Sequence, residues 1–272
     1  MFIWLPPSES KTPPARGPRF DLAQLARPEL ASWRENLIRD IQALSAHDDA
    51  AHLFGLGPAS AADLQANIDL YSAPCDVAEN LFTGVLYDAA KFPTLPKQHH
   101  AVARETTRVF SGLFGVVNLD DVLPNHRLAM GTKLPGVGPL PTYWKKPLDA
   151  SLKAEAEGAP IVDARSGPYR SACLAPWAHR IEIGVVRQAN GKRSVISHDA
   201  KRWRGLACAH LYASISADAD FDAIVEALCS TTTLDPIMDA QGGVHAVTDV
   251  EVPEAKPTKQ GGSLTQLVLV TD

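Results

Sequence analysis

Short apolar runs alternate along this chain with longer segments of helical periodicity, and this alternation restricts the fold more than any other feature. Residues 2–5 (FIWL), 159–164 (APIVDA) and 264–270 (LTQLVLV) are apolar runs of the kind that form buried strands. Residues 28–45 carry apolar side chains at helical spacing, and Pro28 stands where a first helical turn tolerates proline. Because the strands and helices follow no fixed repeat, the pattern predicts an α/β fold with a mixed β-sheet and flanking helices.

The same patterns predict the remaining elements. Helices are expected over 60–70, 97–109, 142–157, 202–213 and 219–229. Strands are expected over 179–187 and 193–198, joined by an Asn190-Gly191 turn, and within 244–252. Pro147 must start or kink the helix that contains it. No linker or repeat interrupts the 272 residues, so we expect one compact domain over 1–272.

Charge is distributed unevenly around a formal net charge of −5. Residues 46–82 carry six acidic residues and 213–255 carry nine, and neither segment holds Lys or Arg. Residues 122–148 hold four basic residues and no acid, and 187–210 hold six basic residues against Asp199. This segregation predicts a positively charged, anion-binding cleft in an otherwise acidic protein; two separate solvated faces are the alternative.

Several protein classes are disfavoured by composition. No stretch approaches the roughly 18 apolar residues of a membrane span, and MFIWLPP is too short for a signal peptide, so we expect a cytoplasmic protein that binds no membrane. The four cysteines are scattered, which suggests buried thiols rather than disulfides or a zinc site. No metal site or cofactor is predicted, since no H-E-x-x-H, G-x-S-x-G or post-strand G-x-G-x-x-G motif is present.

Polar stretches at the ends of apolar segments form the candidate site. They are 6–12 (PPSESKT), 82–89 (FTGVLYDA), 110–134, 163–170 (DARSGPYR) and 197–205 (SHDAKRWRG). Lys11 would supply a point charge, although a solvated lysine in a polar loop is the alternative. Asp121 and Arg127 are close enough in sequence to pair, which would either orient Arg127 toward a phosphate or carboxylate or form a structural salt bridge.

The candidate residues fall into two groups. Asp163, His198 and Lys201 are the candidate catalytic residues, because Asp163 and His198 are the motif side chains that can change protonation near neutral pH. The predicted binding cleft comprises Ser8, Lys11, Thr12, Thr83, Ser111, Asp121, Arg127, Lys133, Tyr143, Ser166, Tyr169, Ser197 and Arg204. Of all these, we expect the following to converge on one cleft: Ser8, Lys11, Ser111, Arg127, Tyr169 and Lys201.

Residues 134–139 (LPGVGP) look like the hairpin of a helix-hairpin-helix DNA-binding element, whose glycines let backbone N–H groups approach a phosphate. Such an element needs a helix before the hairpin, and the preceding RLAMGTK reads as extended. Lys133 and Tyr143 are therefore better candidates for the cleft than the glycines between them.

In order and spacing, these stretches resemble the peroxide stress protein YaaA family. The resemblance rests on LPPSESKT, FTGVLYDA, SGLFGVV, DVLPNHRLAMGTKL, YW at 143–144, VDARSGPYR and VISHDAKRWRG, from residue 2 to about 212 and more weakly beyond. It implies a cytoplasmic bacterial protein with a mixed α/β fold, a positively charged cleft and a helix-hairpin-helix-like element. It also implies DNA binding and protection from hydrogen peroxide through intracellular iron. Two positions depart from the family: Ser10 replaces a Gly or Ala, and His126 replaces a Tyr.

Two functions from different classes follow. The first is binding of the DNA phosphate backbone in the response to hydrogen peroxide. The second is an enzyme that acts on a nucleotide or other phosphorylated small molecule, in a specialised biosynthetic pathway for example. The second gains from a sequence pI near 6.0, below that expected of a dedicated DNA-binding domain. An iron sequestrant is a weaker third function, and the substrate, the reaction and the oligomeric state stay open.

Overall fold

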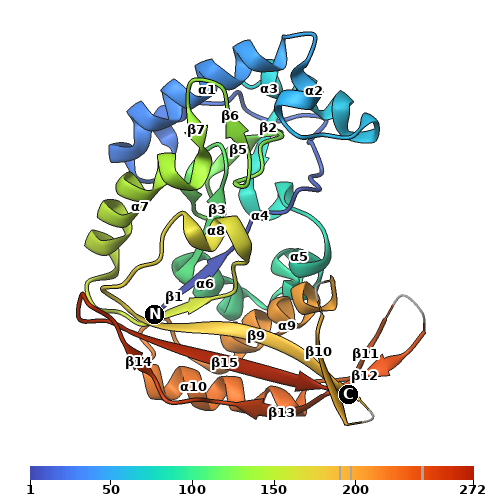
Figure 1. Cartoon of the computed structure of the whole chain (residues 1–272), viewed down its shortest axis with the longest axis vertical. Coiled ribbons are helices and arrows are strands. Elements are labelled where there is room, and N and C mark those ends of the chain that lie inside the picture. Colours follow the sequence, from blue (N-terminus) through green and yellow to red (C-terminus); the bar gives the residue numbers. More distant parts are fainter. Residues whose placement is uncertain (190, 197, 240–241) are drawn as a thin grey trace.

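A mixed β-sheet with a parallel centre carries the fold. The computed structural model describes residues 1–189, 191–196, 198–239 and 242–272 (Figure 1). The strands of the sheet are β1 (Phe2–Leu5), β3 (Thr107–Ser111), β4 (Gly115–Val117), β8 (Ile161–Asp163), β9 (His179–Ala189), β10 (Lys192–Val195), β13 (Val247–Glu251), β14 (Lys256–Pro257) and β15 (Ser263–Thr271).

Strand order shows where the sheet is parallel. The order is β13-β15-β9-β8-β1-β3-β4, with β10 paired to β9 and β14 to β15. Strands β15, β9, β8, β1 and β3 run parallel, whereas β13 and β4 are antiparallel to their neighbours. The predicted mixed α/β sheet is therefore confirmed.

The central strands are apolar because both of their faces are covered. Ile3, Trp4 and Leu5 of β1 are all buried, as are Ile161 and Val162 of β8. Parallel strands that are buried on both faces read as continuous apolar runs rather than as alternating ones. This explains why FIWL and APIVDA could be assigned to strands from the sequence.

Each predicted helical segment contains a helix with shifted ends, although most of 60–70 is a 3₁₀ turn, and four short helices were not predicted. The helices are α1 (Ala31–Ser45), α2 (Ala50–Leu53), α3 (Gln65–Ile68), α4 (Ala78–Leu81), α5 (Val85–Ala90), α6 (Lys97–Thr106), α7 (Leu140–Ala156), α8 (Gly167–Ser171), α9 (His198–Ser214) and α10 (Phe221–Cys229). Short 3₁₀ turns are η1 (Leu22–Gln24), η2 (Pro28–Leu30), η3 (Pro58–Leu64), η4 (Phe92–Thr94) and η5 (Ser230–Thr233). No helix in these described segments is long and apolar enough to cross a membrane.

Two predicted elements end early because residues at their predicted ends belong to other elements. The helix predicted over 97–109 ends at Thr106, because the following residues join the sheet as β3. The strand predicted to reach residue 198 ends at Val195, and α9 begins at His198. Pro147 lies inside α7, which begins at Leu140, and this internal position is one of the two that the prediction allowed. The predicted turn includes Asn190, which lies outside the described residues.

Residues 134–139 belong to a β-hairpin and not to a helix-hairpin-helix element. Strands β6 (Lys133–Leu134) and β7 (Gly138–Pro139) pair antiparallel, and α7 follows directly. No helix precedes them over 121–132, which the structure describes in full. The remaining two-stranded sheets join β2 (Cys75–Val77) to β5 (Val122–Pro124) and β11 (Ile237–Met238) to β12 (Val244–His245).

The topology brings distant loops to one edge of the sheet. The chain passes from β1 to β3 on one side, and later places β8 on the other side of β1. Such a reversal of strand order leaves a crevice at the carboxyl ends of the strands, where open α/β sheets bind ligands. The loops that follow β1 and β8 meet there, and α9 lies against α5 and β9 (Figure 1).

Candidate functional site

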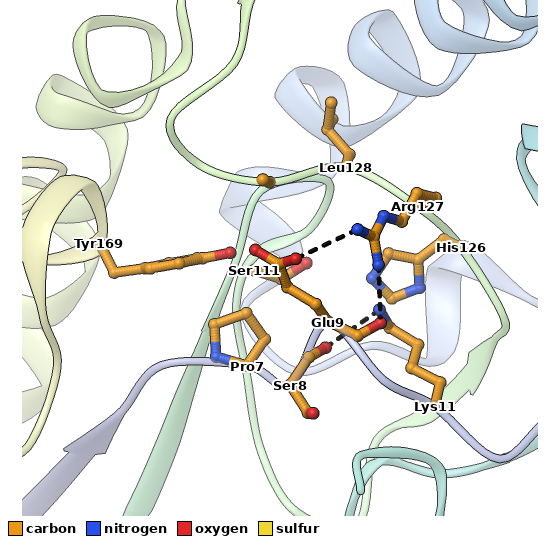
Figure 2. Close-up of a pocket in the computed structure, with 10 residues that line it drawn as sticks. Pro7, Ser8, Glu9, Lys11, Ser111, His126, Arg127, Leu128 and Tyr169 are labelled. Atoms are coloured by element: carbon orange, nitrogen blue, oxygen red, sulfur yellow. Dashed lines mark hydrogen bonds and ion pairs between the residues drawn. The ribbon is translucent and has the colours of Figure 1, made fainter. Parts of the chain in front are cut away.

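Two adjoining pockets lie at the carboxyl ends of β1, β3 and β8, and together they are called the cleft below. The smaller, with about 10 Å³ of space, is lined by Pro7, Ser8, Glu9, Lys11, Ser111, His126, Arg127, Leu128, Ala129 and Tyr169 (Figure 2). The larger, of about 560 Å³, is lined by Pro6, Pro7, Ser8, Glu9, Ser10, Gly84, Val85, Leu86, Tyr87, Ala129, Gly131, Ser166, Pro168, Tyr169 and Lys201. The two pockets share Ser8 and Tyr169, so the six residues expected to converge line one continuous site.

Backbone contacts hold the loop after β1 in place. The amide N–H of Thr12 donates to Leu81 O at 3.0 Å, and that of Thr83 donates to Ser10 O at 3.3 Å. Thr12 and Thr83 therefore position the loop through their main chains, and neither lines the cleft. The predicted place of Thr12 and Thr83 among the residues that line the binding cleft is not supported by this geometry.

Lys11 places its ammonium group in the smaller pocket. Nζ donates to Ser8 O at 3.2 Å and lies 5.6 Å from the centroid of the Phe82 ring. Burial, together with the neighbouring charge of Arg127, lowers the pKa of Lys11 to about 8. Among the described residues, that bond to Ser8 is the only hydrogen bond of Nζ, so further N–H groups are available to an incoming acceptor.

His126 lines the smaller pocket together with Lys11 and packs against two phenylalanine rings. Its ring meets Phe82 and Phe114 edge to face, and Nδ1 lies 3.0 Å from Pro124 O. Burial, and then the charge of Lys11, hold the pKa of His126 well below its ordinary value. The imidazole is therefore neutral and adds no charge to the cleft.

Arg127 pairs with Glu9 and not with Asp121, so the predicted Asp121–Arg127 pair is wrong. Nη1 of Arg127 donates to Glu9 O at 3.2 Å, and Nη2 donates to Glu9 Oε2 at 3.1 Å (Figure 2). Asp121 is buried elsewhere and accepts from the amides of Ala26 at 2.9 Å and Asn118 at 2.7 Å. The Asp121 carboxylate therefore stabilises the turn at Asn118, and its closeness to Arg127 in the sequence does not reflect a contact between the two side chains.

Two hydroxyl groups of the cleft keep a proton for donation. Ser111 Oγ accepts from the amides of Leu113 and Phe114, both at 3.2 Å. Tyr169 Oη accepts from the amide of Met130 at 3.4 Å, and burial raises the pKa of Tyr169 to about 12. Since both oxygens act as acceptors within the protein, their O–H groups can donate to an anion in the cleft.

The larger cavity is lined by Ser166 and Lys201 on its far side. Ser166 is the residue before α8, and its hydroxyl makes no capping hydrogen bond to that helix. Lys201 is exposed on the first turn of α9. These two residues were predicted on sequence grounds and do line the cavity.

Asp163 lies beneath the cleft, and the expectation that it exchanges protons near neutral pH is wrong. Its buried carboxylate accepts from Arg165 at 2.8 and 2.9 Å and from Arg180 at 2.9 Å. Burial alone would raise the pKa of Asp163, but Arg165, Arg170 and Arg180 together hold it below its ordinary value. The carboxylate stays ionised and stabilises a buried arginine cluster.

Three further predicted cleft residues lie elsewhere. Arg204 donates from Nε to Ile183 O at 2.9 Å. Tyr143 donates to Trp33 O at 2.7 Å, and Lys133 is exposed in the β6–β7 hairpin. None of them lines either pocket of the cleft.

Ser197 and His198 are the two predicted site residues that remain. Ser197 lies outside the described residues, and His198 is placed as the first residue of α9. Within the described part of the chain, no group of three or more His, Cys, Asp or Glu side chains is arranged to hold a metal ion.

Glu9 and Gly84 are cleft residues that sequence reasoning missed. Glu9 stands inside PPSESKT, yet a carboxylate is not an obvious member of an anion-binding site. Gly84 has φ +102°, and a Cβ added there would lie 2.9 Å from Ser8 Oγ. The glycine in FTGVLYDA was the available signal, since only glycine adopts this backbone without strain.

Gly84→Ala is expected to destabilise the protein by about 1–3 kcal/mol and to displace the Ser8 side chain, because both the backbone angle and the contact are unfavourable. Thermal unfolding of the variant measures the first effect. Gly57→Ala is the matched control, because Gly57 has φ −76° and an added Cβ meets nothing within 4 Å. Equal stability of the two variants would show that the Gly84 segment relaxes freely.

Comparison with known proteins finds relatives over most of the chain. A family model described as peroxide stress protein YaaA matches residues 1–223. A UPF0246 protein of Corynebacterium efficiens is 39% identical over 209 residues, which cover 75% of this chain and 82% of that protein. A UPF0246 protein of Streptomyces coelicolor is 32% identical over 231 residues, which cover 84% of this chain and 89% of that protein. Residues 1–223 include every residue of the cleft.

Proposed function

The chain belongs to the peroxide stress protein YaaA family, and from this premise we propose that its cleft binds a small phosphorylated molecule of nucleotide size. The family description supports a role for this binding in the response to hydrogen peroxide, and the family resemblance supports a cytoplasmic location. The phosphate would lie where the smaller pocket opens into the larger cavity, because the smaller pocket alone has space for little more than one water molecule, and the body of the molecule would lie in the larger cavity.

One observation carries the proposal: cationic and hydroxyl groups from separate loops line two adjoining pockets, the larger of which has the size of a small molecule. Lys11 and Ser8 follow β1, Ser111 ends β3, Tyr169 follows β8, and Lys201 lies on α9. The volume of about 560 Å³ falls within the roughly 300–1,000 Å³ typical of ligand pockets. Charge-assisted hydrogen bonds from such groups are the usual means of binding phosphate.

The same geometry supports Lys11 as the group that transfers a proton, should the ligand react. With a pKa of about 8, Lys11 is present in both protonation states near neutral pH, whereas Asp163 stays ionised. The proposal therefore moves the acid–base role from Asp163 to Lys11.

Binding of the DNA backbone is a second proposal, favoured by exposed lysines outside the cleft. Lys133 of β6 and Lys145 and Lys146 of α7 are exposed on neighbouring elements. By contrast, Arg202 and Arg204 of α9 donate to the carbonyl oxygens of Met238 and Ile183. This arrangement supports weak, sequence-independent contact with phosphates more than a dedicated DNA surface.

Calorimetric titration with AMP, adenosine and a duplex of about 20 base pairs, at about 50 and 200 mM salt, separates the two proposals. We expect AMP to bind with one-to-one stoichiometry and adenosine to bind at least about 10-fold more weakly, because adenosine lacks the charge-assisted contacts. DNA binding should be weak and should fall steeply with salt. Tight DNA binding without measurable AMP affinity would overturn the small-molecule proposal.

A further inference from the structure

Glu9 occupies the side of Arg127 that faces the cleft. Its backbone oxygen and its carboxylate both accept from the Arg127 guanidinium, at 3.2 and 3.1 Å (Figure 2). Glu9 also lines both pockets of the cleft. A negatively charged group of this chain therefore already sits where an anionic ligand would be held.

The ion pair between Glu9 and Arg127 is weak enough for an anionic ligand to replace Glu9. The Glu9 side chain is 61% exposed, whereas that of Arg127 is 18% exposed. An ion pair with one solvated partner is weak, because water and salt screen it. Among the described residues, the Glu9 carboxylate has Arg127 as its hydrogen-bond donor. The smaller pocket has only about 10 Å³ of space while Glu9 lines it, so a phosphate that contacts Arg127, Lys11 and Ser111 needs the space that the Glu9 carboxylate occupies.

We propose that Glu9 is an internal competitor of the ligand: its carboxylate holds Arg127 in the empty cleft and is displaced by the anionic group that binds. This inference rests on the proposed function and describes how that same site is regulated. It makes Glu9 a determinant of affinity that lowers the binding of every anion and leaves neutral molecules unaffected.

The competition has a specific thermodynamic signature. Every ligand that takes over Arg127 must first break the same Glu9 contact, so each loses the same factor in affinity. Glu9→Gln removes the charge and keeps the shape of the side chain. It is expected to tighten AMP and inorganic phosphate by the same factor, about 3- to 5-fold, which is the range open to an exposed ion pair. Adenosine binding should not change.

A double-mutant cycle with Arg127→Gln tests the mechanism by calorimetry. If Glu9 acts through Arg127, Glu9→Gln should have no effect on AMP binding in the Arg127→Gln background. Asp63→Asn is the matched control, because Asp63 Oδ2 lies 3.8 Å from Arg127 Nη1 but lines neither pocket. Asp63→Asn removes an equal charge near Arg127 but leaves the Glu9 carboxylate in the cleft. We therefore expect it to change AMP affinity less than Glu9→Gln does.

The outcomes separate this inference from the proposed function. Equal AMP affinity of the native protein and Glu9→Gln overturns the competition and leaves the proposed function intact. The same holds if Glu9→Gln acts equally in the Arg127→Gln background, or if Asp63→Asn tightens AMP as much, because either result indicates long-range electrostatics alone. Absence of AMP and phosphate binding in all the proteins overturns the proposed function, and the competition with it.

Discussion

Asp163→Asn is expected to lower the free energy of unfolding by about 3–5 kcal/mol, the cost typical of removing one partner from a buried ion pair. The substitution keeps the shape of the side chain but leaves the buried Arg165 and the nearly buried Arg180 without their shared counter-charge. Urea unfolding at neutral pH measures the change. Asp48→Asn, at an exposed position, is the control and should alter stability by less than about 0.5 kcal/mol.

The pH dependence of stability should identify the same group. The pKa of Asp163 is lower in the folded protein than the unfolded value of about 3.9. Its contribution is therefore complete above about pH 4 and is lost as the pH falls through the folded pKa. The variant should lose less stability than the native protein over this acidic range. A variant of native stability that loses only activity would restore the acid–base role to Asp163.

Lys11→Ala is expected to weaken AMP binding by about 10- to 150-fold, which corresponds to the loss of one charge-assisted hydrogen bond of about 1.5–3 kcal/mol. Adenosine binding should change little, since its contacts would lie in the larger cavity. Lys97→Ala, at an exposed position on α6, is the matched control. Duplex DNA should also be nearly unaffected, because one phosphate contact among several is lost.

Lys11 also predicts how AMP affinity depends on pH. An anion stabilises the protonated amine, so binding raises its pKa from about 8. Affinity should therefore vary little between about pH 7 and 8 and should fall by up to about tenfold per unit at higher pH. Lys11→Ala should remove this decline. A native protein whose affinity is constant from about pH 7 to 10 would contradict the role of Lys11 as the charged contact.

The parts of the fold that depend on local pattern could be predicted from the sequence. Strand β1 and strand β8 were found because burial on both faces leaves an uninterrupted apolar run. The end of α6 could not be found, because Thr107–Ser111 has an ambiguous pattern, and its pairing with β1 decides that it is a strand. That pairing joins residues about a hundred positions apart.

In the candidate site, too, features set by local pattern could be predicted and contacts between distant residues could not. Loops at strand ends line the two pockets, because parallel strands bring their carboxyl ends to one edge. Individual pairings were not predictable: Asp163 meets Arg180 only because β8 pairs with β9, and Arg127 meets Glu9 only because the loop after β1 folds back across the cleft. Charge patterning likewise singled out residues 122–148, but it could not show that Arg127 lines the cleft and Lys133 does not.

The position of β1 between β3 and β8 has a consequence for synthesis on the ribosome. Trp4 pairs with Arg108 on one side and with Asp163 on the other, so β1 must wait for both partners to be translated. At roughly 5–20 residues per second, the second partner follows β1 by about 8–30 seconds. Strand β1 has no native neighbour until β3 emerges, and one of its two edges stays unpaired until β8 emerges. Nascent chains are thus exposed to aggregation and to chaperone capture until β8 emerges.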